Sequence, residues 1–133
     1  MPINTAIYVG PLALILLVLS FRVIGMRYKA RLAIGSGGNK RIERAMRVQA
    51  NFAEYAPFAL IAIGAGEIAG ASPVLVHVLG IALVVGRLSH AVGVSQMQEP
   101  LILRQIGIVL TTGVIFVASA VASIFALQKV LSA

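Results

Sequence analysis

Three polar side chains in an otherwise apolar stretch are the residues best placed to do chemistry. Arg47, Asn51 and Glu54 are spaced i, i+4 and i+7, which puts a cation, an amide and a carboxylate on one helical face within two turns. Strongly apolar sequence follows from Tyr55 onward. An ionisable group at the centre of a membrane helix costs about 2.5–3.5 kcal/mol, so it normally faces a partner or a cavity. We therefore expect function at this polar stripe.

The composition indicates an integral membrane protein. Of 133 residues, 59% are hydrophobic and only 11% are charged, and the mean hydropathy of +0.99 lies far outside the range of soluble domains. The net charge is +7, but the cations are concentrated in one part of the chain rather than spread over a basic face. This concentration indicates a loop on the cytoplasmic side of the membrane and argues against a nucleic-acid partner. Its members are Arg22, Arg27, Lys29, Arg31, Lys40, Arg41, Arg44 and Arg47.

Four apolar runs are each long enough to cross a bilayer, which takes about 20 residues. The predicted fold is all-α, a single membrane domain over residues 1–133 built as a four-helix bundle. The predicted spans are about 5–26, 44–70, 73–95 and 101–128.

The order of charges along the chain predicts the orientation of these spans. Cations follow the first apolar run instead of preceding it, so we expect a retained span rather than a cleaved signal peptide. The basic connector, residues 27–43, is then cytoplasmic and both termini are external.

This topology brings the remaining polar groups to the cytoplasmic end. Arg87 and His90 arrive there on the third span and Arg104 leaves on the fourth, with Arg31 within reach. A basic concavity beside apolar walls suits an amphipathic anion. The alternative is that these groups serve packing alone, with Glu54 paired to Arg87 or Arg47.

Several kinds of catalytic site are excluded by composition. The chain has no cysteine, which excludes disulfides, catalysis by a cysteine thiolate of the protein and zinc–thiolate sites. It also has no aspartate, which excludes a Ser-His-Asp triad. His77 and His90, its two histidines, are not spaced as a ligand set, so no metal site is predicted.

Two segments resemble the MAPEG family, the membrane-associated proteins in eicosanoid and glutathione metabolism. The resemblance covers nearly the whole chain in the number of spans and the order of motifs. The first segment is similar to the family's second-helix signature at eight positions: Glu43-Arg44-x-x-Arg47-x-Gln49-x-Asn51-x-x-Glu54-Tyr55-x-Pro57. The second is similar to the third-helix signature: Gly86-Arg87-x-x-His90-x-x-Gly93.

The resemblance implies a homotrimer with glutathione bound between neighbouring subunits at the cytoplasmic end. By motif position, the polar stripe would hold the carboxylates and the amino group of glutathione. The full set of implied binding residues is Arg47, Asn51, Glu54, Tyr55, Arg87 and His90.

The resemblance also implies two catalytic arginines. Arg104 resembles the arginine that stabilises the glutathione thiolate in active members. Arg31 corresponds to a first-helix arginine that contacts the same ligand, with Arg27 as its rival for that place. A guanidinium near a thiol lowers the thiol pKa, which otherwise lies at about 8.5.

The chain departs from the pattern of eicosanoid-handling members at Val94, where they carry a tyrosine. Leukotriene or prostaglandin synthesis is therefore not expected. The compact loops resemble bacterial members, which implies an inner-membrane glutathione transferase or peroxidase acting on lipophilic electrophiles or lipid hydroperoxides. The alternative is a non-catalytic protein that binds lipid or glutathione. A small multidrug-type transporter fits less well, since residues 1–21 lack the carboxylate it needs.

Overall fold

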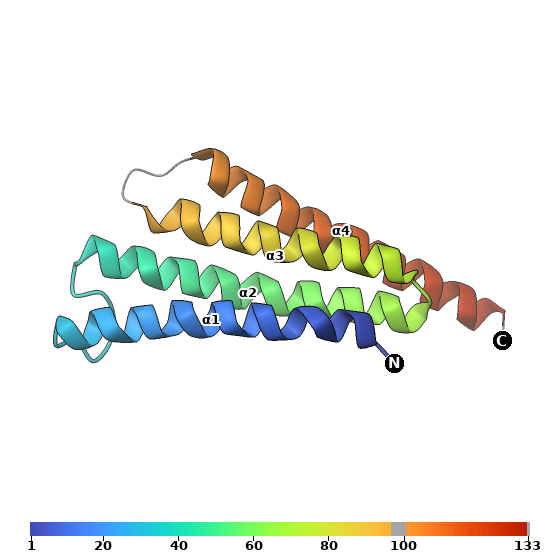
Figure 1. Ribbon diagram of the computed structural model, residues 1–133, viewed down its shortest axis with the longest axis horizontal. Helices are drawn as coiled ribbons and strands as arrows, with labels where there is room; N and C mark the ends of the chain where they lie inside the picture. Colours follow the sequence, from blue (N-terminus) through green and yellow to red (C-terminus); the bar gives the residue numbers. More distant parts are fainter. Residues whose placement is uncertain (97–100, 133) are drawn as a thin grey trace.

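The computed structural model describes residues 1–96 and 101–132, and its chain runs up and down through four helices (Figure 1). All four are long and apolar enough to cross a membrane, which confirms the predicted all-α membrane bundle. The trimer stays a prediction. The helices are α1 (Ile3–Lys29), α2 (Lys40–Ala69), α3 (Pro73–Ser95) and α4 (Leu101–Leu131).

Side-chain caps set where two of the helices begin. The Asn39 side chain accepts hydrogen bonds from the backbone N–H groups of Arg41 and Ile42, at 2.9 and 3.3 Å. These bonds satisfy amides that have no partner inside the helix, and α2 therefore starts at Lys40, a turn before its predicted span. The Ser72 hydroxyl caps α3 in the same way.

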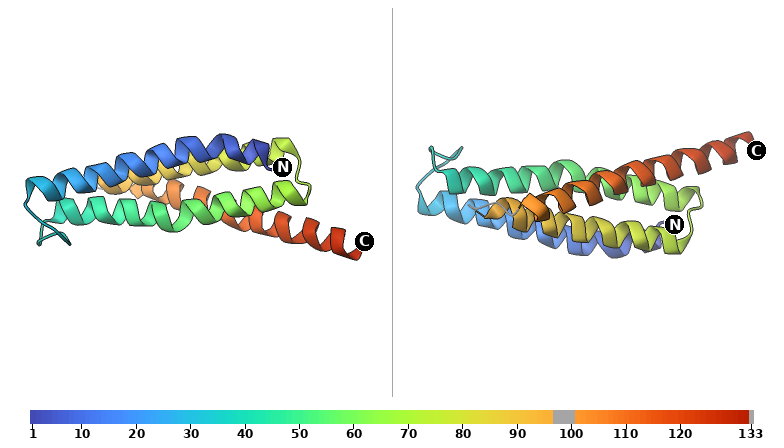
Figure 2. Two further views of the ribbon diagram at one scale, coloured as in Figure 1. Left: turned by 90° about the horizontal axis from the view of Figure 1, so that it is seen from below. Right: turned by 90° about the horizontal axis from the view of Figure 1, so that it is seen from above.

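The central layer of the bundle is formed by α2 and α3. Each of them contacts every other helix, whereas α1 and α4 make no contact with each other within the described residues. The two views in Figure 2 show α1 and α4 on different sides of this pair. The buried positions of α2 recur every three or four residues, as a helix with one core-facing side requires: Ile42, Ala45, Val48, Phe52, Ala56, Ala59, Ile63 and Gly66.

Glycines let α3 and α4 approach closely at the end where α4 begins. A Cβ atom built on Gly107 would lie 2.5 Å from the Cβ of His90 and 2.8 Å from the carbonyl oxygen of Gly86. One built on Gly93 would lie 2.8 Å from the backbone nitrogen of Arg104. Side chains would not fit at these distances, so the glycines allow the two backbones to pack directly. This packing brings His90 and Arg104 together.

The outer helix α4 extends past the other helices at its C-terminal end (Figure 1). Its buried residues form one narrow stripe, Gly107, Thr111, Val114 and Ala118. Its remaining surface is apolar and exposed; Phe116, for example, is 76% exposed. Such a surface suits a bilayer or another subunit.

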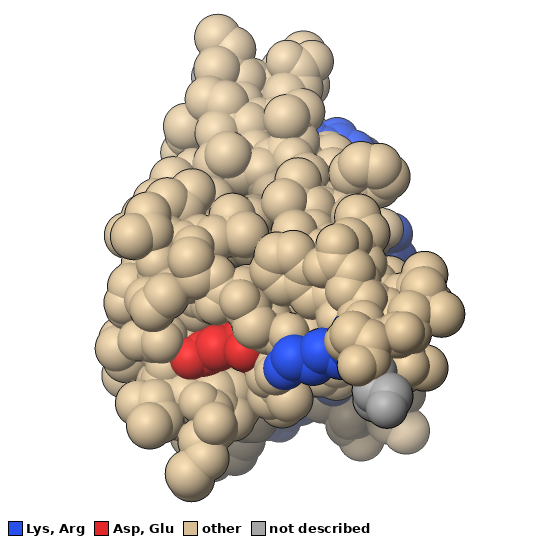
Figure 3. Space-filling view, turned by 90° about the vertical axis from the view of Figure 1, so that its right-hand side faces the viewer, with Lys and Arg blue, Asp and Glu red and all other residues tan. Residues whose placement is uncertain are grey.

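The two ends of the bundle differ in charge. We call the end with residues 30–39 the connector end and the end with the chain termini the termini end. At the termini end the Glu67 carboxylate accepts hydrogen bonds from the backbone and side chains of Asn4 and Thr5, at 2.6–2.9 Å. The Tyr8 hydroxyl lies 2.8 Å from Nδ1 of His77. Otherwise the termini end presents a largely uncharged face (Figure 3).

Candidate functional site

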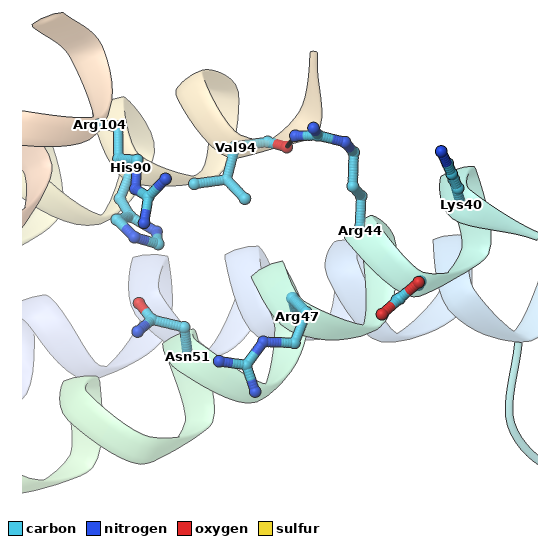
Figure 4. A pocket seen from close by; sticks show the side chains of 8 residues that line it. Lys40, Arg44, Arg47, Asn51, His90, Val94 and Arg104 are labelled. Carbon is cyan, nitrogen blue, oxygen red and sulfur yellow. Dashed lines mark hydrogen bonds between the residues drawn. The ribbon is translucent and has the colours of Figure 1, made fainter. Parts of the chain in front are cut away.

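A cavity of about 400 Å³ opens at the connector end between α2 and the α3–α4 pair (Figure 4). Four cationic side chains and one carboxylate line it, so the described walls carry surplus positive charge. A concave surface of one charge sign concentrates ligands of the opposite sign. We call this the charged cavity; its walls are Lys40, Glu43, Arg44, Arg47, Asn51, His90, Val94 and Arg104.

Of the two arginines that α2 contributes to this cavity, one is bonded to α3 and the other has no partner among the described residues. Nη1 of Arg44 donates to the carbonyl oxygens of Val94 and Gln96, at 3.4 and 3.3 Å. These carbonyls belong to the C-terminal end of α3, where helical partners run out, so Arg44 ties α2 to α3. Arg47 is exposed and makes no hydrogen bond or ion pair with any described residue. Its charge is therefore available to a ligand.

A smaller hollow of about 160 Å³, the inner chamber, shares three walls with the charged cavity: Asn51, His90 and Arg104. In Figure 4, His90 and Arg104 lie side by side and point across the cavity toward Asn51. The inner chamber adds Tyr55, Arg87, Ile108, Thr111 and Thr112.

Arg87 is a buried cation held by uncharged groups. It is 2% exposed, and its Nε donates to Thr111 Oγ1 at 2.9 Å. Its Nη1 donates to Asn51 Oδ1, also at 2.9 Å. The guanidinium carbon lies 5.9 Å from the centre of the Tyr55 ring, within cation–π range. No carboxylate among the described residues pairs with it, which leaves the inner chamber positively charged.

An apolar groove of about 510 Å³ continues from the inner chamber along α2 and α4. It shares Tyr55 and Thr112 with the inner chamber. Its other walls are Ile115, Phe116, Ser119, Ala120 and Ser123. Each hollow thus shares lining residues with the next. The row begins with cationic side chains at the connector end and ends at an apolar surface within the membrane-spanning region.

Comparison with known proteins identifies the family. The sequence model of the MAPEG family matches residues 5–124. The chain belongs to the MAPEG family. It is also 38% identical over 89 residues to inner membrane protein YecN of Escherichia coli K12, an alignment that covers 67% of this chain and 68% of the relative. The protein of the same name from Escherichia coli O6:H1 gives the same values.

Family membership and the four apolar helices agree on the location of this MAPEG protein. Together with the inner-membrane relative, they support a bacterial inner-membrane location. The predicted orientation, with external termini and a cytoplasmic connector, stays a prediction.

Most of the predicted site residues of this MAPEG protein come together. Members of both family signatures and the fourth-helix arginine share the charged cavity or the inner chamber, although their roles toward a ligand stay predictions. The residues brought together are Arg47, Asn51, Tyr55, Arg87, His90 and Arg104.

Glu54 is placed differently from its partners in the polar stripe. It is exposed on α2 and lines none of the three hollows. The carboxylate at the charged cavity is Glu43 instead. Among the described residues Glu54 forms no ion pair with Arg47 or Arg87. The pairing expected if these groups served packing alone is therefore not found within one chain.

The two candidate arginines of the first span also lie away from the charged cavity. Arg31 follows the end of α1 with a φ of 54°, and it lines a separate hollow with Tyr28, Lys29 and Leu32. Arg27 donates to the carbonyl oxygen of Gly35 at 3.1 Å, which holds the connector. Neither joins the cluster within one chain, so a role for Arg31 requires a neighbouring subunit.

Thr111 and Thr112 were not predicted from the sequence, although both line the inner chamber. The hydroxyl of a threonine in an apolar helix commonly donates to a carbonyl oxygen one turn earlier. A threonine in such a helix therefore gives no sign in the sequence that it lines a site. The one available signal was spacing, because Arg104, Gly107 and Thr111 follow i, i+3, i+7 and therefore share a face.

Proposed function

We propose that this protein is a membrane glutathione transferase with peroxidase capacity. One observation carries the proposal: the charged cavity, the inner chamber and the apolar groove share walls in series. A hydrophilic, anionic thiol would occupy the cationic part, and a lipophilic co-substrate would approach along the apolar part. Few other reaction classes need both surfaces side by side.

The cationic walls match the charges of glutathione. Its two carboxylates can be bound by Arg47 and Lys40, because charge-assisted hydrogen bonds contribute about 1.5–3 kcal/mol each. Its ammonium group can be bound by Glu43, the one carboxylate in the described walls.

The thiol would lie near Arg104, which lines both the charged cavity and the inner chamber. The guanidinium is always protonated and cannot act as a base, so it stabilises the thiolate while the thiol proton passes to water. The thiolate sulfur then attacks an electrophilic carbon, the carbon–sulfur bond forms, and a halide leaves with the bonding electron pair.

With a lipid hydroperoxide, the same thiolate would attack the terminal oxygen and break the oxygen–oxygen bond. The lipid leaves as an alkoxide, which takes up one proton to become an alcohol, and glutathione is oxidised to its sulfenic acid. A second glutathione converts the sulfenic acid to the disulfide and releases water. Glutathione is thus the only reductant required.

The exposed charges on α2 and the connector support assembly as a trimer with sites between subunits. Glu54 is exposed on a membrane helix, where an uncompensated charge is costly. Covering by a neighbouring subunit would remove Glu54 from lipid and bring it to the bound peptide. The same assembly would bring Arg31 of one subunit to the charged cavity of the next.

A second candidate is a glutathione- or lipid-binding protein without turnover. Val94 favours it, because an apolar side chain lines the charged cavity where eicosanoid-handling members carry a tyrosine. In that case glutathione would bind saturably and no electrophile would be conjugated.

The test is conjugation of glutathione to an aryl halide by the purified protein in detergent. We expect turnover by the wild type and its loss in Arg104→Ala. Arg22→Ala is the matched control, because Arg22 lies at the same end but donates to Ser95 at 2.6 Å and lines none of the three hollows. Binding without turnover in the wild type would favour the second candidate. Absence of both binding and turnover at millimolar glutathione would exclude the proposal.

A further inference from the structure

A further groove, of about 510 Å³, lies between α1 and α3 in the half of the bundle nearer the connector end. We call it the α1–α3 groove. It shares no lining residue with the charged cavity, the inner chamber or the apolar groove, and the glutathione chemistry does not use it. We propose that the α1–α3 groove binds one acyl chain of an anionic phospholipid, whose phosphate is bound by Arg22 and Ser95.

The helices α1 and α3 are joined on both sides of this groove. On the termini side, a Cβ atom added to Gly80 would overlap the Tyr8 ring, so the ring packs directly against the backbone of α3. The Tyr8 hydroxyl also lies 2.8 Å from Nδ1 of His77. On the connector side, Nη1 of Arg22 donates to the hydroxyl oxygen of Ser95 at 2.6 Å. The groove is therefore an elongated hollow of limited length.

Apolar side chains of both helices line the groove without filling it. Leu14 and Val18 of α1 are 64% and 67% exposed, and Leu88 and Val92 of α3 are 46% and 49% exposed. From Leu14 to Arg22 the helix rises roughly 12 Å. A hydrocarbon chain laid along this length would supply the van der Waals partners that the two walls lack.

The Arg22–Ser95 pair offers donors for a phosphate at one end of the groove. A guanidinium has only donors, so the Ser95 oxygen accepts from Arg22 and the Ser95 hydroxyl proton is left for another acceptor. The remaining N–H groups of Arg22 bond to no described residue. Phosphate oxygens can accept from both side chains, and the planar guanidinium matches phosphate geometry.

The position of Arg22 fits the level of a phospholipid headgroup. Residues 1–21 contain no Asp, Glu, Lys or Arg, so Arg22 is the first charged side chain after the apolar part of α1. Such a residue indicates where the hydrocarbon ends. Basic sites between membrane helices at this level bind anionic headgroups, and the groove lining contains no carboxylate to compete.

Charge also separates this occupant from two others. An apolar helix of a second subunit would cover the walls of the groove but would leave the unused donors of Arg22 without an acceptor. A zwitterionic lipid carries a cation beside its phosphate, which weakens its attraction to a guanidinium. An anionic phospholipid satisfies both the apolar walls and the charge.

The test uses a single introduced tryptophan, because the chain contains none. Leu14→Trp places this reporter on the groove wall. Leu17→Trp is the matched control, since Leu17 is exposed about one turn along the same helix but does not line the groove. Each variant is reconstituted in phosphatidylcholine vesicles that contain a minor fraction of phosphatidylglycerol. Bromine, which quenches tryptophan fluorescence, is carried on the acyl chains of either the phosphatidylglycerol or an equal amount of the phosphatidylcholine.

We expect brominated phosphatidylglycerol to quench Leu14→Trp about threefold more strongly than brominated phosphatidylcholine does, because the groove selects the anionic lipid. Leu17→Trp should be quenched equally by both lipids. Arg22→Gln in the Leu14→Trp background should remove the preference, and Arg22→Lys, which keeps the charge, should retain part of it. If Leu14→Trp does not fold, Leu88→Trp reports from the opposite wall.

Four results would overturn the proposal. Equal quenching of the groove reporter by both lipids would show that the groove does not select anionic lipid. A preference that persists in Arg22→Gln would exclude the phosphate site, and the same preference in Leu17→Trp would assign it to lipid around the whole protein. Absence of quenching at the groove would assign the groove to a subunit interface. None of these readouts involves glutathione, so this inference and the proposed function fail separately.

Discussion

The two ends of the bundle use polar residues in opposite ways. At the termini end the Glu67 carboxylate accepts four hydrogen bonds from the first turn of α1, and Tyr8 bonds His77 across α1 and α3. At the connector end Arg47 and the Asn51 amide nitrogen have no partner among the described residues. Polar groups that are hydrogen-bonded to another helix hold the helices together, whereas donors without a partner beside a cavity are available to a ligand.

Residues of the second-helix family signature differ in this respect from the polar residues at the termini end. Glu67 and His77 belong to neither signature and have partners inside the chain. The second-helix signature holds the residues with unused donors. Changes at the termini end should therefore alter stability alone, and changes at the connector end should alter ligand binding first. The predictions below test that division.

The largest effect is expected at Gly107, where one substitution should alter both stability and ligand binding. Gly107→Ala would place a Cβ atom 2.5 Å from that of His90 and force α3 and α4 apart. Overpacking of this kind costs about 1–3 kcal/mol, here toward the upper limit because backbone atoms also obstruct. Melting temperature and glutathione affinity should both fall. Gly113→Ala is the control, since nothing lies within 4 Å of its added Cβ; an equal loss there would contradict the close-approach account.

Arg47→Ala should weaken glutathione binding without loss of stability. The lost charge-assisted hydrogen bond, about 1.5–3 kcal/mol, corresponds to roughly a 10- to 100-fold higher Kd. Arg47 has no bond to any described residue, so the melting temperature of the unliganded protein should not change. Calorimetric titration and thermal unfolding measure the two quantities. A lower melting temperature with an unchanged Kd would assign Arg47 to structure.

Glu67→Gln should lower stability and leave glutathione binding unchanged, the reverse of Arg47→Ala. The amide keeps one acceptor oxygen but loses the charge and the second oxygen that Asn4 and Thr5 require. We expect a loss of about 1–3 kcal/mol in the free energy of unfolding. Glutathione affinity, measured in the same titration, should match the wild type. Impaired binding in this variant would show that the two ends are coupled.

Tyr8→Phe is expected to have the smallest effect. It removes the hydroxyl that bonds His77 at 2.8 Å and leaves the ring against Gly80. A single neutral hydrogen bond contributes about 0.5–1.5 kcal/mol. Thermal unfolding should report this loss, and conjugation of an aryl halide should proceed at the wild-type rate. A slower rate would extend the functional region to the termini end.

The fold could be predicted from sequence because membranes impose strong constraints. Apolar runs of sufficient length fix the number of helices, and α2 carried its own cap signal at Asn39. The helix α2 starts at Lys40, ahead of the membrane span predicted to begin at about residue 41 or 44, because hydropathy indicates the membrane-spanning part and the Asn39 cap sets the start of the helix.

Helical spacing in the sequence predicts which residues of the candidate site share a helix face, but not how the helices pack against one another. The i, i+4, i+7 pattern placed Arg47, Asn51 and Glu54 on one face, but it cannot tell which part of that face the next helix covers. Glu54 therefore proved to be exposed, outside the hollows of one chain. The bond from Arg87 to Thr111 depends on the close approach of α3 and α4 and has no counterpart in sequence spacing.

A structure determined with glutathione added tests the central claim most directly. We predict ligand density in the charged cavity between Asn51 and Arg104, with a carboxylate at hydrogen-bond distance from Arg47 and the sulfur nearest Arg104. An empty charged cavity at saturating glutathione, or density at a site away from these residues, would contradict the account.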